Sequence, residues 1–468
     1  MSSTILLLMT LLPSGQTTQP AAAAVELGDT YADVMFGFTI RPPKDWQANT
    51  RREYNGHATL VLQLMEPALS NRPRAIIVEH VGSPRTVEMK DRLRQAELML
   101  NVELTQPKTD VSELRAFDGR PGAYLSAHYR VDEEERFRLT AIIEIAPRNY
   151  LMMRHDGRGE DRADTEAIFR AVMDSIRLLA KPLTEKELRT ALDAGADWMK
   201  EVDAARLKAA LMATQYFLYE QNGKPIGLLE ITERENRVRR GKTRYDGIEI
   251  TQQSWMFDAP AAVRRYQHRI QIDDDFEREE WQSSAVTWIR PAGDTPEQFE
   301  NAYQEGLRSL DVLLSSQSSS LSEPVKTNPP LKLPRTYITR TLTNLLPRLL
   351  GNLDKPRTLA FLTFDHELGV LVQKIVEIKG ETTLPGEPDG RKIYRIDDRV
   401  GVAAEPAQMF VDEGGRVLLV KTRNWTLRPA APDELRKLFE ERVKDCEEAA
   451  QRMEQLYQDS GSRFIRPR

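Results

Sequence analysis

Six histidines are spread along the 468 residues, and no two of them lie at metal-ligand spacing on one predicted helix. The best candidate for a metal site is the run Met152, Met153 and His155, because thioether and imidazole ligands suit copper. Met153 and His155 would share one face of a strand. Three ligands in one short strand cannot close a coordination shell alone, so we interpret the methionines as core residues beside a surface histidine. The sequence therefore predicts no metal site.

Two charged clusters are candidates for ion binding. The acidic run at residues 273–280 lacks the tight-turn glycine of a calcium loop, so we interpret it as a solvated turn between strands. The basic run at residues 237–244 would suit phosphate or an acidic partner. The expected structure there is a charged hairpin tip, which keeps a sheet edge soluble.

Nucleophile and nucleotide motifs are missing from the sequence. It contains no Gly-x-Ser-x-Gly, no Walker loop and no Gly-x-Gly-x-x-Gly. The single cysteine, Cys446, falls on the apolar stripe of a predicted helix, where burial suppresses the reactivity of a thiol. One cysteine also excludes an intramolecular disulfide and a zinc site built from several thiolates. The sequence predicts no catalytic residue and no cofactor, so we expect the protein not to be an enzyme.

Aromatic residues supply the one candidate binding site. Trp255, Met256, Trp281 and Trp288 all fall within predicted strands. If their sheet curves into a half-barrel, its concave face would hold an acyl chain or an apolar peptide. The alternative is that the rings pack beneath covering helices and fill an ordinary core.

The chain that must position these residues has a globular composition, with 40% hydrophobic and 29% charged residues. Its length predicts two or three domains. A formal net charge of −5 indicates no general attraction to nucleic acid.

An apolar stretch at residues 5–12, followed by alanines at residues 21–24, predicts a signal peptide over residues 1–24. We therefore expect an exported protein, periplasmic or extracellular, with no transmembrane segment after this leader. No Lys or Arg precedes the apolar stretch, so either the signal is weak or the true start lies upstream.

Residues 30–180 have the pattern of strands, a helix, more strands and a closing helix. The block begins with Phe36-x-Phe38-x-Ile40-x-x-Pro43-x-x-Trp46 and ends with an amphipathic helix that runs into Ser-Ile-Arg-Leu-Leu. It resembles the PsbP-like and DcrB-like group of small exported domains, although the group commonly has a glycine just before the tryptophan. The resemblance implies an α+β fold that binds or stabilises partners, with no shared catalytic residues.

The rest of the chain also divides by pattern. The predicted parts are a helical connector, a first antiparallel half-sheet plus a helix, a Ser/Pro linker, a second antiparallel half-sheet and a terminal helix, at residues 182–212, 213–314, 315–332, 333–430 and 432–460. The fold class is therefore α+β, with antiparallel sheets covered by helices in several domains. In strand pattern and length, the region after residue 213 resembles the curved sheets of LolA-like exported carriers.

Three functions are compatible with these patterns. The leading hypothesis is an exported, non-catalytic binding or scaffold protein with an unknown protein or apolar small-molecule partner. The first alternative is a carrier of lipid or another apolar ligand in the concave sheet, and the second is an enzyme of unrecognised type. The oligomeric state stays open.

Overall fold

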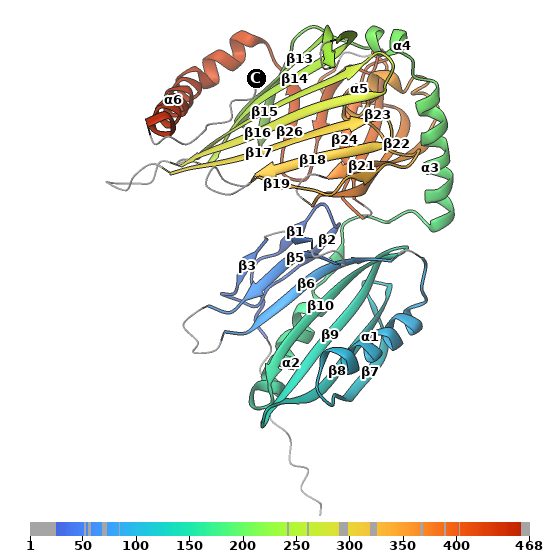
Figure 1. Cartoon of the computed structure of the whole chain (residues 1–468), viewed down its shortest axis with the longest axis vertical. Coiled ribbons are helices and arrows are strands. Elements are labelled where there is room, and N and C mark those ends of the chain that lie inside the picture. Colours follow the sequence, from blue (N-terminus) through green and yellow to red (C-terminus); the bar gives the residue numbers. More distant parts are fainter. Residues whose placement is uncertain are drawn as a thin grey trace, which may run out of the picture.

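The computed structural model describes residues 25–459, apart from residues 51–52, 55–57, 68–72, 84, 241–242, 260–261, 290–297, 319–324, 366–367, 388–389 and 402. The predicted signal peptide lies outside the described residues. The described chain forms two regions packed against each other (Figure 1). Strands make up 52% and helices 22% of it, so the protein is richer in strands than a balanced α+β fold.

The first region is built on an eight-stranded antiparallel sheet. Its strands, in spatial order, are β3 (Gln47–Asn49), β5 (Ala58–Met65), β6 (Ala75–Gly82), β10 (Asn149–Arg158), β9 (Glu134–Ala146), β8 (Arg120–Val131) and β7 (Lys108–Phe117), with β4 (Glu53–Tyr54) beside β5. The Asp118-Gly119 pair forms the turn between β7 and β8, where the sequence places a hairpin.

Two helices pack on opposite faces of this sheet. The helix α2 (Arg162–Asp174, after the short 3-10 turn η1, Gly159–Asp161) buries Phe169, Val172 and Met173 in the main core. The helix α1 (Met89–Glu103) packs on the other face, against β7 and β8, through Leu93 and Leu100. Because residues alternate between faces along each strand, β9 and β10 contribute to both sides.

A small sheet of β1 (Tyr31–Asp33), β2 (Phe38–Ile40) and β11 (Arg177–Leu178) joins the first region to the second. Gly37, with φ of +69°, follows β1, and a Cβ there would lie 1.6 Å from the Ala403 carbonyl oxygen. Ala403 and Leu368 of the second region are buried in the core of the first. The two regions therefore share a packed interface, and only glycine fits at residue 37.

The second region begins with α3 (Glu185–Lys200) and α4 (Ala204–Ala209). Thr184 and Glu187 form the capping box predicted at the start of α3. One antiparallel sheet of fifteen strands follows. Its first half comprises β12 (Gln215–Gln221), β13 (Lys224–Arg240), β14 (Thr243–Ala259), β15 (Ala262–Asp273), β16 (Arg278–Ile289), β17 (Gln298–Ser309), β18 (Val312–Ser318), β19 (Lys326–Thr327) and β20 (Leu331–Lys332).

The second half of this sheet comprises β21 (Arg357–Asp365), β22 (Val370–Thr382), β23 (Ile393–Val400), β24 (Ala407–Val411), β25 (Val417–Lys421) and β26 (Thr426–Pro429). Pairing of β26 with β12 joins the two halves. The helix α5 (Arg340–Leu349) lies between them, and its leucines form one core with residues of both halves. The rings of Trp281 and Phe364, one from each half, lie 6.4 Å apart, so the sheet folds back around α5.

Two other helices cover the outside of the second region and lie on opposite sides of it (Figure 1). The helix α3 packs against β21 through small and apolar residues. The helix α6 (Pro432–Asp459) places Leu435, Phe439 and Cys446 against the outer side of the first half-sheet. Helices thus cover parts of the sheets, which agrees only in part with the fold predicted from the sequence.

The structure differs from the sequence prediction between residues 295 and 332. A helix is predicted at residues 295–314, whereas the described residues from Gln298 onward form β17 and β18. The predicted Ser/Pro linker includes the end of β18 and two short paired strands. Pairing with β16 overrides the helix propensity of the Glu, Gln and Ala residues in β17.

Candidate functional site

The four residues of the predicted binding site point to two sides of the sheet. Trp255 and Trp288 are buried on the outer side, where they pack with α6. Trp281 points inward and belongs to the core around α5. Met256 follows Trp255 in a regular part of β14, so it faces the inner side, over Gly227. The structure therefore does not bring the four side chains together around one ligand.

The inner side of the second sheet is occupied by α5. Six of the ten residues of this helix are buried there, and the core includes isoleucines from β14 and β15 as well as valine and isoleucine from β22. The Arg340 guanidinium stacks on the Trp281 ring at 3.9 Å from its centroid, and burial lowers the pKa of Arg340. This side of the sheet is packed in the manner of a core around Trp281, the tryptophan of the predicted site that points inward.

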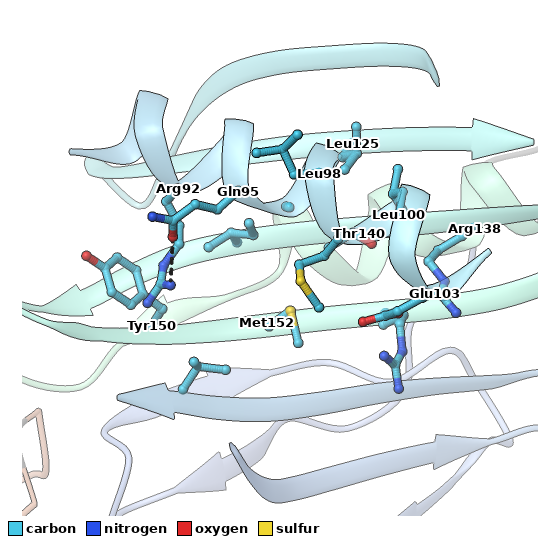
Figure 2. A pocket seen from close by; sticks show the side chains of 15 residues that line it. Arg92, Gln95, Leu98, Leu100, Glu103, Leu125, Arg138, Thr140, Tyr150 and Met152 are labelled. Carbon is cyan, nitrogen blue, oxygen red and sulfur yellow. Dashed lines mark hydrogen bonds and ion pairs between the residues drawn. The ribbon is translucent and has the colours of Figure 1, made fainter. Parts of the chain in front are cut away.

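A different site opens in the first region, beside α1. This helix packs on β7 and β8, so it leaves the same face of the neighbouring strands β9, β10 and β6 uncovered. A cavity of about 540 Å³ lies there, within the range of roughly 300–1,000 Å³ typical of small-molecule sites. Apolar side chains supply much of its lining, from Val81, Ala96, Leu98, Met99, Leu100, Leu125, Ile142 and Met152. We call this cavity the α1 groove (Figure 2).

The helix contributes an unusual amount of exposed apolar surface to the α1 groove. Leu98 is 60% exposed and Met99 is 49% exposed, and both line the groove. The neighbouring Val102 is 78% exposed. Only Leu93 and Leu100 of α1 are buried, so the helix has more apolar residues than its contact with β7 and β8 uses. A solvated apolar patch of this kind marks many binding sites.

One end of the α1 groove carries an arginine that pairs with no carboxylate of the described residues. The guanidinium of Arg92 stacks on the Tyr150 ring at 4.4 Å from its centroid. Its Nη1 donates to Gln95 Oε1 at 3.3 Å, and its buried Nη2 has no hydrogen-bond partner among the described residues. The Tyr150 hydroxyl donates to the Val87 carbonyl at 3.1 Å, and burial raises the pKa of this phenol. Because Arg92 forms no ion pair with the described residues, its positive charge is available to an anion that enters this end of the groove.

At the other end of the groove, arginines are balanced by acids. Arg138 donates to Glu103 at 2.5 Å and to Asp156 at 2.6 Å. The Nε atom of Arg154 lies 3.8 Å from Asp156, beyond hydrogen-bond distance. Figure 2 shows Arg92 and Tyr150 at one end, Glu103 and Arg138 at the other, and Met152 between them.

The three residues considered as a copper site in the sequence, Met152, Met153 and His155, lie on two different faces of the sheet. Met152 lines the α1 groove, whereas Met153 is buried in the core on the α2 side. His155 shares that face with Met153 but is 2% exposed, so the expectation of a surface histidine is wrong. Its Nδ1 bonds to the Ala75 carbonyl at 2.7 Å, and burial lowers its pKa. Throughout the described residues, no group of three His, Cys, Asp or Glu side chains could hold a metal ion.

The acidic and basic clusters both lie at the ends of paired strands of the second sheet. Asp273 accepts the backbone N–H groups of Glu277 and Arg278, so the predicted turn between β15 and β16 is present. Asp273 and Glu279 are buried, however, so the expectation of a fully solvated turn is wrong for these two carboxylates. The described backbone of the basic run lies at the ends of β13 and β14, whose last pair is Arg240 with Thr243. Residues 241–242 and the side chains of residues 238–244 lie outside the described ones. Cys446 is buried against the sheet, and burial raises the pKa of its thiol.

Comparison with known proteins gives structural neighbours alone. No family model matches the chain, and no curated protein matches it. The solution structure of cyanobacterial PsbP (CyanoP) from Synechocystis sp. PCC 6803 is 14% identical and has a TM-score of 0.27, with 35% of this chain and 98% of that chain covered. The chain thus has a PsbP protein among its structural neighbours, as the motif at residues 36–46 predicted.

Two further neighbours were found. PA94 from Pseudomonas aeruginosa, a protein of unknown function described as a putative regulator, is 14% identical at a TM-score of 0.24, covering 34% of this chain and 99% of its own. LpqN of Mycobacterium tuberculosis, involved in cell envelope biogenesis, is 14% identical and has a TM-score of 0.25. The match covers 30% of this chain and 83% of LpqN. Scores this low carry no functional argument, and the resemblance to LolA-like carriers stays a prediction.

Sequence reasoning missed the α1 groove. Its floor comes from Thr140 and Ile142 of β9 and from Tyr150, Met152 and Arg154 of β10, which alternate with core residues along each strand. The sequence did contain a signal, because Leu98, Met99 and Val102 give this helix more apolar residues than one apolar stripe needs.

No helix among the residues that the structure describes has the length and hydropathy needed to cross a membrane.

Proposed function

We propose that this chain is an exported, non-catalytic binding protein and that the α1 groove is its ligand site. The observation that carries the proposal is an apolar groove of about 540 Å³ whose wall includes the exposed side chains Leu98 and Met99. Burying such surface under a ligand is favourable by about 25 cal/mol for each Å² of apolar area.

Two further observations support this assignment. The sequence lacks the nucleophile and nucleotide motifs named above, which favours binding over catalysis. The apolar leader and the alanines after it favour export. The groove also replaces the sheet around Trp281 as the place for an apolar ligand, since α5 packs against that residue.

The groove is tested by filling it. Met152 lies on the groove floor, so Met152→Trp should occupy the site and lower the binding of the uncharged apolar dye Nile red at least tenfold. Val102→Trp adds the same ring on an exposed part of α1 outside the lining and should leave dye binding unchanged. Equal dye binding by both variants, with unchanged circular dichroism spectra, would overturn the groove as the ligand site.

Export is tested separately. The full chain, expressed in a Gram-negative host, should be recovered from the periplasm with a mature N-terminus near residue 25, as measured by intact mass. Recovery of the uncleaved chain from the cytoplasm would contradict export and would leave the groove unaffected.

A further inference from the structure

We infer that the ligand of the α1 groove is an anionic amphiphile with a single acyl chain, its head group bound by Arg92 and its chain lying along Met152. This inference rests on the proposed function and names the ligand class of the same site. Three arginines line the groove, and Glu103 and Asp156 lie beside two of them, so the charge of Arg92 is left unbalanced among the described residues in a chain with a formal net charge of −5. An anion is favoured in such a site.

The head group belongs at the Arg92 end because the charges at the two ends differ. At the far end, Arg138 binds two carboxylates and the Nε of Arg154 lies 3.8 Å from one of them, whereas Arg92 pairs with no carboxylate of the described residues. Its Nη2 is buried without a hydrogen-bond partner among those residues. Leaving a buried cationic donor unpaired is costly, so a carboxylate, sulfate or phosphate oxygen there would satisfy it. The stacked Tyr150 ring holds the guanidinium in place for that contact.

The chain belongs between α1 and the sheet because most of the lining between Arg92 and the charged residues at the far end is apolar. Ile142 and Met152, paired across β9 and β10, form the floor, and Leu98 and Met99 form part of the helical wall. These side chains carry no hydrogen-bond donor that would select a sugar or a peptide backbone. Their surface matches methylene groups.

The length of the groove sets the length of the chain. From Tyr150 to Arg154 the strand advances four residues, which is about 13 Å at ~3.3 Å per residue. An extended acyl chain advances ~1.3 Å for each carbon, given carbon–carbon bonds of ~1.5 Å. About ten carbons therefore span the groove before the chain meets Arg154 and the ion pair of Arg138 with Glu103.

The test is calorimetric titration of the mature protein with three ten-carbon amphiphiles below their micellar concentrations. Decanoate and decyl sulfate should bind, and uncharged decyl glucoside should bind at least tenfold more weakly. Arg92→Gln should weaken decanoate binding about 10- to 100-fold, because a hydrogen bond to a charged group is lost. Arg92→Lys keeps the charge and should recover part of it.

Arg94→Gln is the matched control, since Arg94 is an exposed arginine on the same helix and does not line the groove. It should leave decanoate binding unchanged, and thermal unfolding of all variants should match that of the wild type. In a series of fatty acids from acetate to dodecanoate, the binding affinity should rise with chain length and level off near ten carbons.

The possible outcomes separate this inference from the proposed function. In one outcome, decanoate and decyl glucoside bind equally, Arg92→Gln has no effect, and Met152→Trp abolishes the binding of both amphiphiles. This result would overturn the anionic head group and keep the groove as a ligand site. No binding of any amphiphile, with no effect of Met152→Trp on the dye, would overturn both. Weaker decanoate binding in Arg94→Gln than in Arg92→Gln would place the head group elsewhere and overturn the assignment of Arg92.

Discussion

The ion pair between Arg348 and Glu233 holds the C-terminal end of α5 inside the second sheet. The Nη1 and Nη2 atoms of Arg348 donate to the Glu233 carboxylate at 2.6 and 2.5 Å. The two side chains are 10% and 2% exposed, and Glu233 also accepts the Met212 backbone N–H at 2.8 Å. Replacing Arg348 with Met removes the cation and leaves the carboxylate buried.

We expect Arg348→Met to lower the free energy of unfolding of the second region by about 3–5 kcal/mol. With a urea dependence of roughly 3 kcal/mol per molar, the midpoint should fall by about 1–1.7 M. Tryptophan fluorescence reports this transition, since five of the six tryptophans follow residue 185.

Arg335→Met is the matched control, because Arg335 pairs with Asp193 at 2.7 Å while its side chain is 72% exposed. An exposed pair contributes less than about 1 kcal/mol. The double variant Glu233→Gln/Arg348→Met should recover most of the lost stability, since the neutral amide oxygen still accepts the Met212 N–H. A midpoint for Arg348→Met equal to that of the control, or a double variant no more stable than the single one, would refute the reasoning.

Two other predictions concern the same sheet. Burial, together with the nearby Arg340 charge, lowers the pKa of His268 to about 3. The unfolded chain therefore takes up this proton below about pH 6.5 while the folded one does not, so stability falls as pH falls through that range, by about 2 kcal/mol between pH 7.5 and pH 5. In urea unfolding at both pH values, His268→Gln should lose about 2 kcal/mol less than the wild type, and an equal loss would contradict this. A Cβ at Gly306 would lie 2.2 Å from the buried Trp281 ring. Gly306→Ala should therefore lower the free energy of unfolding by about 1–3 kcal/mol and alter tryptophan fluorescence. An unchanged urea midpoint would contradict this, because it would show that the ring moves without loss of stability.

Local patterns in the sequence predicted the elements whose signals are themselves local. The Asn222-Gly223 pair, a residue pair typical of hairpin turns, joins β12 and β13, and Thr184, a residue type typical of helix starts, caps α3. The predicted stripe of α6 is also confirmed, since Phe439 and Cys446 are buried on the sheet. A turn or a cap depends on a few adjacent residues, so no knowledge of distant contacts was needed.

Elements decided by distant contacts were missed. The sequence analysis placed α5 within a half-sheet, although Thr339 caps it and its leucines recur at helical spacing. Pro347 within the helix weakened that signal. The tryptophans were predicted as one site because each lies in a strand, but Trp281 and Trp288 are seven residues apart and so face opposite sides.

The helices α5 and α1 both lie on a sheet, and the difference between them explains where a ligand site is left. Six of the ten residues of α5 are buried, and both of its ends are tied to the sheet, at Glu279 by backbone N–H groups and at Glu233 by Arg348. Such a helix is part of the core. Two of the fifteen residues of α1 are buried, and its remaining apolar side chains stay exposed beside β9 and β10. We therefore propose that a partner molecule binds the apolar surface that α1 leaves uncovered, with Arg92 at its edge.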